Sequence, residues 1–309
     1  MTINPHPSLP EFDYIRPATL AEASGFLARH PDEARPLLGG TDLFVRMRDG
    51  FIHPRYLVDV KHLDGTDTLR YVPAGEGRAE AGLTLGAAVN MNRLIASPEV
   101  QAHYPLLAEA CRSVASYQLR TRATIVGNLC NASPAGDTTG ACLVYNGVLQ
   151  VHGVEGPRQE PLEIFFLGPG KTRLKPGDIV TAIHFPPPPK DSEGIYLKLG
   201  RNKLSDLAIV GVTVLGYPDA SAASGYRLRI ALASVAPVPL RAAQAEDYLA
   251  EHPLSPETLQ EAARLAMEAC SPIDDVRGSA PYRRAMVRNL TRKGLEAVTS
   301  RLLHPTDHE

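Results

Sequence analysis

The sequence predicts an α+β protein of two domains. The chain has 309 residues, which exceeds the size at which a single hydrophobic core usually stops growing. Four consecutive prolines at 186–189 interrupt any helix or strand ladder and mark a boundary. Strand and helix patterns are mixed before this boundary, whereas three apolar strand patterns followed by helices come after it.

The region after a proline-rich N-terminal arm predicts a helix and then a compact βαβ unit. The helix spans 17–30, where Thr19 can cap its start and Glu22 completes a capping box. The βαβ unit consists of a short strand at 37–38, a helix at 41–48 and a strand at 55–60.

Gly39–Gly40 separates the first strand of this unit from its helix. Free backbone N–H groups at a helix start suit an anion. The two glycines could instead form a tight turn that needs positive φ. Their position alone leaves both interpretations open.

The middle of the chain predicts two further strands at 83–89 and 179–185 and a helix from Pro105 through Ser116. Residues 142–153 alternate around Asn146–Gly147, which indicates a β-hairpin. Small and polar side chains fill 124–138. This segment is either a loop that lets the backbone approach a phosphate or a surface loop with turn chemistry.

Beyond the prolines, the sequence predicts an antiparallel sheet covered by helices. Three strands are expected at 196–201, 207–217 and 226–235. Helices follow at about 240–251, 256–269 and 280–303. The apolar stripe of the last helix indicates core or interface.

Composition excludes several classes of function. A net charge of −2 gives no electrostatic case for nucleic acid or an anionic membrane, and no apolar run approaches the ~20 residues of a membrane span. The four cysteines lack metal-ligand spacing, so no metal site is predicted and an iron–sulfur cluster held by this chain alone is disfavoured. No signal peptide is visible, and a cytoplasmic location is the expectation.

Four motifs in order carry a family resemblance: PLLGGTDL (36–43), RATIVGNLCNASPAGDT (122–138), FFLGPGKTRLKPGDIV (165–180) and DVRGSAPYRR (275–284). Together they resemble the FAD-binding medium subunit of molybdenum hydroxylases, across about 9–303. That family includes the flavoprotein subunits of carbon monoxide dehydrogenase and bacterial xanthine dehydrogenase, and the β subunit of 4-hydroxybenzoyl-CoA reductase.

The resemblance implies an FAD-binding domain at 9–185, with two α+β subdomains at about 9–60 and 61–185, of the type seen in vanillyl-alcohol oxidase relatives. It also implies a smaller domain at 190–303 of the carbon monoxide dehydrogenase flavoprotein type, with a three-stranded antiparallel sheet and helices.

The resemblance further implies that non-covalent FAD is bound with its pyrophosphate between two glycine-containing loops. The first loop comprises Leu37, Leu38, Gly39, Gly40, Thr41, Asp42 and Leu43. The second supplies Thr124, Gly127, Asn128, Asn131 and Asp137, and further contacts come from Val114, Ala115, Val180 and Lys198.

The chemistry of these loops suits a diphosphate that is held without a basic cluster. Backbone N–H groups, together with the Thr41 and Thr124 hydroxyls, can bind it. We expect the Asp42 carboxylate to cap backbone groups, and Asp137 to accept hydrogen bonds from ribose or adenine. Family members usually have two glycines where this chain has Val126–Gly127, and we expect only Gly127 to make the close approach.

The resemblance implies an electron-transfer subunit with no catalytic acid or base of its own. Its partners would be a large molybdopterin subunit and a small subunit with two [2Fe–2S] clusters, assembled as a dimer of heterotrimers. The cysteine-bearing insertion of the 4-hydroxybenzoyl-CoA reductase subunit has no counterpart here. The alternatives are a flavin-free subunit that bridges partners and a stand-alone flavin oxidoreductase.

Overall fold

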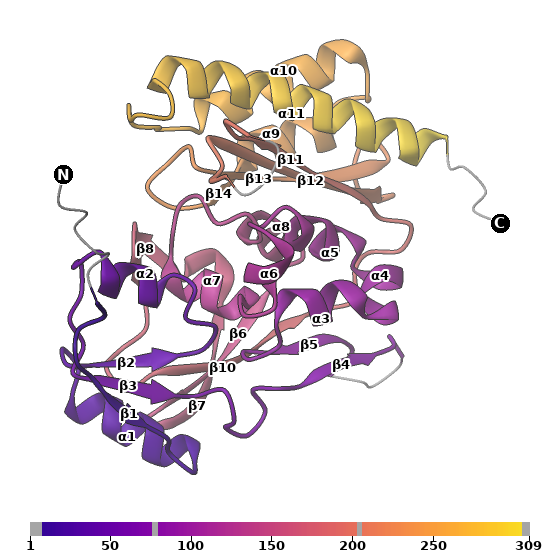
Figure 1. The fold of residues 1–309 in the computed structure, drawn as a ribbon. Coiled ribbons are helices and arrows are strands. Elements are labelled where there is room, and N and C mark those ends of the chain that lie inside the picture. The colour runs from indigo at the N-terminus through magenta and orange to yellow at the C-terminus, as the bar shows by residue number, and fades with distance from the viewer. Residues whose placement is uncertain (1–7, 76–79, 203–205, 305–309) are drawn as a thin grey trace.

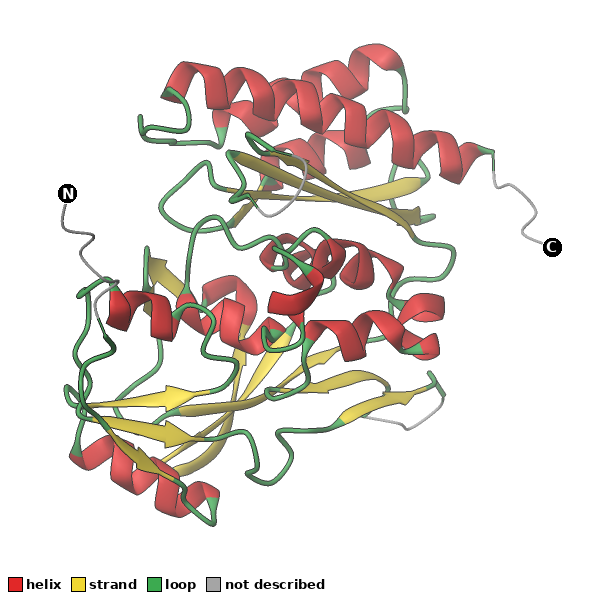
Figure 2. Cartoon of the chain, in the orientation of Figure 1, coloured by secondary structure: helices red, strands yellow, loops and turns green. Residues whose placement is uncertain are grey.

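The computed structural model is a stack of alternating sheet and helix layers. It describes residues 8–75, 80–202 and 206–304, so the first seven residues of the N-terminal arm lie outside the described part. In Figure 1, two sheets at the base are covered by a layer of short helices, which a second level of sheet and three longer helices then cover. Figure 2 shows the same layers by type of element.

The first sheet is parallel and has the strand order β1–β3–β2. Helix α1 (Leu20–Arg29) connects β1 (Asp13–Ile15) to β2 (Ala34–Leu37), and α2 (Leu43–Arg48) connects β2 to β3 (Tyr56–Asp59). The predicted βαβ unit is therefore confirmed. Thr19 caps α1 by accepting a hydrogen bond from the Glu22 N–H at 3.1 Å, and the Glu22 carboxylate accepts one from the Ala18 N–H at 2.8 Å.

The second sheet is antiparallel and has five strands. Its order is β4 (Leu69–Val72), β5 (Gly82–Gly86), β10 (Ile179–Phe185), β6 (Val148–Gly153) and β7 (Gly156–Pro161). The strands predicted near 83–89 and 179–185 are confirmed. A small ribbon of β8 (Phe166–Gly168) and β9 (Lys171–Thr172) and the 3-10 helix η1 (Leu162–Ile164) follow β7.

The hairpin predicted at 142–153 is wrong in its first arm. The residues before Asn146 end a helix, α8 (Thr139–Val144), and only β6 is a strand. Asn146 has φ +53°, so the Asn-Gly pair does reverse the chain, but between a helix and a strand. Every residue of α8 is buried. Because the whole helix is buried, its apolar residues do not follow the one-sided pattern that distinguishes a helix from a strand.

Six short helices cover the five-stranded sheet: α3 (Met91–Ala96), α4 (Pro98–His103), α5 (Pro105–Arg112), α6 (Tyr117–Arg120), α7 (Ile125–Asn131) and α8. The segment 124–138, expected to be a loop, contains α7. Thr124 caps this helix, because its Oγ1 accepts a hydrogen bond from the Gly127 N–H at 2.9 Å. The helix expected through Ser116 ends at Arg112, and Ser116 instead caps α6.

The C-terminal domain packs directly on this helical layer. Its sheet contains β11 (Glu193–Leu199), β12 (Val210–Pro218), β13 (Tyr226–Ala233) and the short edge strand β14 (Leu240–Arg241). The three long strands are those expected from the sequence. Gly140 of α8 faces this sheet so closely that an added Cβ would lie 2.2 Å from Thr213 Oγ1.

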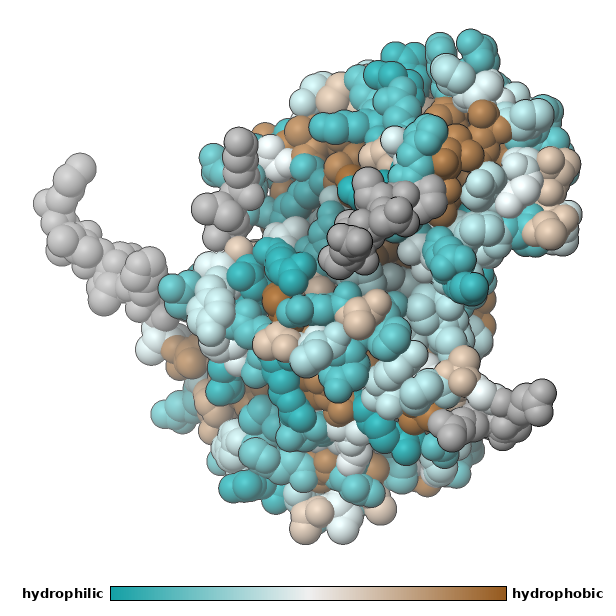
Figure 3. Space-filling model, turned by 90° about the vertical axis from the view of Figure 1, so that its right-hand side faces the viewer, coloured by the Kyte–Doolittle hydropathy of each residue, from teal (hydrophilic) through white to brown (hydrophobic). Residues whose placement is uncertain are grey.

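Three helices close the outer face of the C-terminal sheet, namely α9 (Ala243–Glu251), α10 (Pro256–Glu268) and α11 (Ala280–Leu303). Val287, Leu295 and Val298 of α11 are fully buried against it. The expected apolar stripe of α11 lies beside these residues. Its member Val298 is fully buried and Tyr282 is 44% exposed, while the other three, Met286, Leu290 and Leu302, are partly buried against the core. Figure 3 shows the face at the right-hand side of Figure 1, where the described surface is mainly hydrophilic with separate apolar patches.

The connection between the domains is anchored at its first residues. The Tyr104 hydroxyl, buried in the helical layer, lies 3.2 Å from the Phe185 carbonyl and 2.9 Å from the Pro186 carbonyl.

Among the described helices, none combines the length and apolar character that crossing a membrane requires.

Arg283 is the largest fully buried side chain of α11, at 2% exposure. Its guanidinium donates to the Ile209 and Ser234 carbonyls, each at 2.9 Å, and to Asp275 Oδ1 at 2.6 Å. It therefore joins the loop before α11 to the residue that precedes β12 and the residue that follows β13.

We expect Arg283→Ala to lower the free energy of unfolding by about 3 kcal/mol, since it leaves buried carbonyls without donors. Chemical denaturation followed by circular dichroism measures the change. Arg288→Ala is the control, because Arg288 is exposed on the same helix. Equal stability of the two variants would contradict the prediction.

Candidate cofactor-binding site

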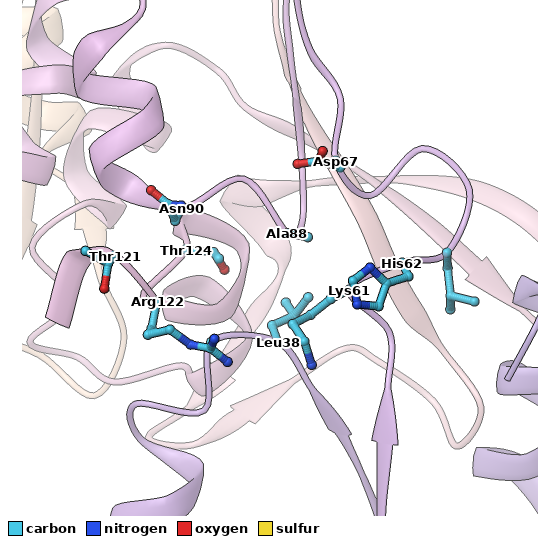
Figure 4. Close-up of a pocket in the computed structure, with 11 residues that line it drawn as sticks. Leu38, Lys61, His62, Asp67, Ala88, Asn90, Thr121, Arg122 and Thr124 are labelled. Carbon is cyan, nitrogen blue, oxygen red and sulfur yellow. The ribbon is translucent and has the colours of Figure 1, made fainter. Parts of the chain in front are cut away.

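A pocket of about 470 Å³ lies where the first glycine loop meets the segment before α7. This volume falls within the roughly 300–1,000 Å³ of small-molecule sites. Figure 4 shows the side chains around it. The lining residues are Leu38, Gly39, Lys61, His62, Leu63, Asp67, Ala88, Asn90, Thr121, Arg122 and Thr124.

The two glycines of the first loop are needed for different reasons. At Gly39, an added Cβ would lie 2.1 Å from the Arg122 carbonyl oxygen, so the glycine permits contact between two backbone segments. Gly40 has φ +75°, and a Cβ there would meet the Phe44 ring at 2.6 Å. The tight-turn interpretation is therefore correct for Gly40, and Gly39 draws the first loop against the second.

Two cations face the pocket. Figure 4 shows the side chains of Arg122 and Lys61 extending on either side of Leu38. The Lys61 ammonium is 2.6 Å from Asp59 Oδ1, and the Asp59 side chain is only 2% exposed. The Tyr14 hydroxyl donates to the other carboxylate oxygen of Asp59.

Asp59 holds the Lys61 side chain in place. Burial alone would raise the pKa of Asp59, but hydrogen bonds from Lys61 and Tyr14 lower that pKa below its ordinary value. The carboxylate is therefore ionised at neutral pH. Lys61 and Arg122, which are far apart in the chain, both line this pocket, although the sequence shows no basic cluster. In the sequence, the only indications of these two cations were Lys61 shortly after the predicted strand at 55–60 and Arg122 just before Thr124.

The opposite wall supplies neutral polar groups. Thr124 Oγ1 accepts the Gly127 N–H, which leaves the hydroxyl proton available for a ligand. Asn90 caps α3 by accepting the Arg93 N–H at 2.9 Å, so its side-chain amide group remains a donor. Asn90 and Thr124 are also joined by an isolated backbone bridge. Residues from both glycine loops and from α3 therefore converge on one cavity.

Three of the predicted site residues line this pocket: Leu38, Gly39 and Thr124. Leu37 ends β2 and is 5% exposed, Thr41 precedes α2, and Leu43 is the first residue of α2. Asp42 caps no backbone group with its carboxylate, contrary to expectation. Its own backbone is already helical, with φ −93° and ψ −39°, whereas a capping side chain needs an extended N-cap backbone.

Val126 causes no strain at its position. It lies in the first turn of α7, is 1% exposed and has no positive φ. A second glycine is therefore unnecessary here. Gly127 makes its close contact within the protein, since an added Cβ would lie 2.9 Å from Thr124 Oγ1.

The other predicted residues lie outside the pocket lining. Asn128 Oδ1 accepts a hydrogen bond from the Thr138 hydroxyl at 2.8 Å, and Asn131 ends α7. Val114 packs beside the main core and Val180 is buried in β10. Ala115 has φ +42°.

Arg120 holds the turn around Ala115 and makes no contribution to the pocket. Its guanidinium donates to the Val114 carbonyl at 2.7 Å and the Arg112 carbonyl at 3.2 Å. This side chain therefore satisfies the carbonyls that follow α5.

Asp137 and Lys198 form an ion pair with each other and do not line the pocket. Asp137 Oδ2 accepts a hydrogen bond from the Lys198 ammonium at 2.8 Å, and Oδ1 accepts one from the Tyr196 hydroxyl at 2.7 Å. Both carboxylate oxygens thus have donors within the protein, which differs from the expected contact with ribose or adenine.

The chain matches two family models in succession. Residues 10–188 match the FAD binding domain in molybdopterin dehydrogenase, and residues 195–298 match the CO dehydrogenase flavoprotein C-terminal domain. Among curated proteins, it is 33% identical over 294 residues to the carbon monoxide dehydrogenase medium chain of Hydrogenophaga pseudoflava, covering 94% of this chain and 98% of that one. It is 32% identical over 289 residues to the xanthine dehydrogenase FAD-binding subunit of Escherichia coli O157:H7, covering 93% and 96%.

Solved structures agree with these matches. A chain of carbon monoxide dehydrogenase from Hydrogenophaga pseudoflava superimposes with a TM-score of 0.88 at 32% identity, covering 95% of this chain and 99% of that one. A chain of quinoline 2-oxidoreductase from Pseudomonas putida 86 superimposes with a TM-score of 0.86 at 25% identity, covering 96% and 100%.

We expect Gly39→Ala to destabilise the fold by about 1–3 kcal/mol, because its methyl group overlaps the Arg122 carbonyl. Thermal and chemical denaturation measure the loss. Gly168→Ala provides the control, since an added Cβ there meets nothing within 4 Å. If both variants were as stable as the wild type, the close contact between the loops would be wrong.

Proposed function

We propose that this chain, which belongs to the family of FAD-binding medium subunits of the xanthine and carbon monoxide dehydrogenases, passes electrons from the [2Fe–2S] clusters of a partner subunit through FAD to an external acceptor. The relatives are named dehydrogenases, so the chain is a subunit of an oxidoreductase. The support from the molecule itself is the pocket between the two glycine loops.

The groups around this pocket fit the diphosphate of FAD. Arg122 can offset negative charge on the diphosphate, Lys61 can add a hydrogen-bond donor although Asp59 balances its charge, and Thr124 with the Gly39 backbone can supply uncharged donors. FAD, when bound, supplies the redox chemistry. This chain then binds and orients the cofactor, and its residues need not donate or accept a proton.

The proposed site also draws on the predicted residues outside the pocket lining. In this proposal the remaining residues of both loops, with Val114, Ala115 and Val180, surround the rest of the cofactor. Lys198 is the contribution of the C-terminal domain. Asp42 and Asp137 do not contact phosphate, because carboxylates there would repel it.

We also propose the partners expected from the family. A large molybdopterin subunit oxidises the substrate, a small subunit carries two [2Fe–2S] clusters, and the assembly is a dimer of heterotrimers. The match over 98% of a chain named as a medium chain supports a role as one subunit of such a complex.

The purified chain should carry non-covalent FAD. We expect a flavin absorption spectrum, and release of FAD on denaturation as shown by mass spectrometry. The bound flavin should be reduced rapidly only when the reduced iron–sulfur subunit is added. A colourless chain that takes up no FAD would favour the flavin-free bridging subunit, and oxidation of an organic substrate by the isolated chain would favour a stand-alone oxidoreductase.

Arg122→Gln should weaken FAD binding about tenfold, since it removes one charge-assisted contact to the diphosphate. Titration of the apoprotein with FAD, followed by flavin fluorescence, gives the dissociation constant. Arg48→Gln is the matched control, because Arg48 is an exposed arginine of α2 that pairs with Asp49. Equal affinity of both variants would remove Arg122 from the site.

A further inference from the structure

The carboxylate of Asp137 is buried between the two domains. Asp137 is 7% exposed, and its two donors, Tyr196 and Lys198, both belong to β11 of the C-terminal domain. Burial and the neighbouring Asp137 charge raise the pKa of Tyr196, so its hydroxyl remains protonated and donates. The two oxygens of one side chain thus bind two residues of the other domain.

Lys198 is held from a second direction. Its ammonium also donates to the Ser113 carbonyl at 3.1 Å, and its side chain is 15% exposed. Ser113 directly precedes Val114 and Ala115, and Arg120 fixes the carbonyls of that turn. The ammonium is therefore fixed between two segments of the FAD-binding domain that the sequence predicts to border the flavin.

Neighbouring residues fix the position of Tyr196, the second donor to Asp137. Tyr196 is oriented at its backbone, where its N–H donates to Glu109 Oε1 of α5 at 3.2 Å. Gly211 of β12 leaves room for the phenol, since an added Cβ would lie 3.0 Å from the Tyr196 hydroxyl oxygen. Such a buried ion pair contributes little net stability, because desolvation offsets its attraction. Its geometry therefore serves placement.

We propose that Asp137 is a positioning residue, which fixes the Lys198 ammonium in the flavin site and so makes the C-terminal domain part of that site. This inference rests on the proposed function. Asp137 acts through Lys198, and the neutralised pair places a cation near the cofactor without adding net charge to the buried interface.

The experiment compares variants of the full chain with FAD bound. Asp137→Asn and Lys198→Met remove either charge, and a double variant removes both. Asp178→Asn is the matched control, because the Asp178 side chain is also only 4% exposed and pairs at 2.6 Å with Arg158, here an arginine of β7 in the FAD-binding domain. The measurements are the FAD dissociation constant, the visible circular dichroism of the bound flavin and its midpoint potential.

We expect Asp137→Asn and Lys198→Met each to weaken FAD binding about tenfold or more and to change the flavin circular dichroism. Asp137→Asn should also raise the midpoint potential, because an ammonium without its counter-charge favours the more negative reduced flavin. The double variant should lose this rise. Lys198→Arg, which keeps the charge, should recover most of the affinity.

Two results would overturn the inference while leaving the proposed function intact. In the first, wild type binds FAD but Lys198→Met differs from it no more than Asp178→Asn does. In the second, Asp137→Asn and the double variant shift the potential equally. Lys198→Met alone decides the matter if Asp137→Asn does not fold. A wild-type chain that binds no FAD contradicts the proposed function itself.

Discussion

The layer of short helices between two sheets is the constraint on which the rest of the structure depends. Helix α7 packs against β10 of the five-stranded sheet, and α8 packs against β12 and β13 of the C-terminal sheet. Neither face of α8 is left for solvent, and at Gly140 there is no space for even a methyl group. The run of small side chains before and within α8 therefore follows from packing as well as from any ligand.

This packing also assembles the candidate site. The segment that begins at Thr124 borders the pocket, and the same segment ends at Asp137 against the second domain. Backbone contact between Gly39 and Arg122 sets the distance between the two loops. Lys61 reaches the cavity because buried Asp59 binds it at the end of β3. The pocket is thus a junction of elements whose positions are fixed by the core.

Local patterns predicted longer elements rich in apolar residues, such as α1, β10, the three long C-terminal strands and α11. They failed at two short helices. The residues 142–145 were expected to form a strand but end α8, and the turn-forming segment 124–138 contains α7. The family motifs located Leu38, Gly39 and Thr124 in the pocket. The second motif begins at Arg122 but did not assign it a role, and no motif contains Lys61. The pairing of Asp137 with Lys198 was also missed, because it depends on a contact between distant segments.

The anchored start of the proline linker has a consequence for how the protein can work. The Tyr104 hydroxyl donates hydrogen bonds to the carbonyls of Phe185 and Pro186, and the prolines that follow restrict the backbone. The chain therefore has little freedom to pivot at this point. In the proposed function, a redox partner would have to dock on the two domains as they stand, and this docking would govern the rate of electron delivery.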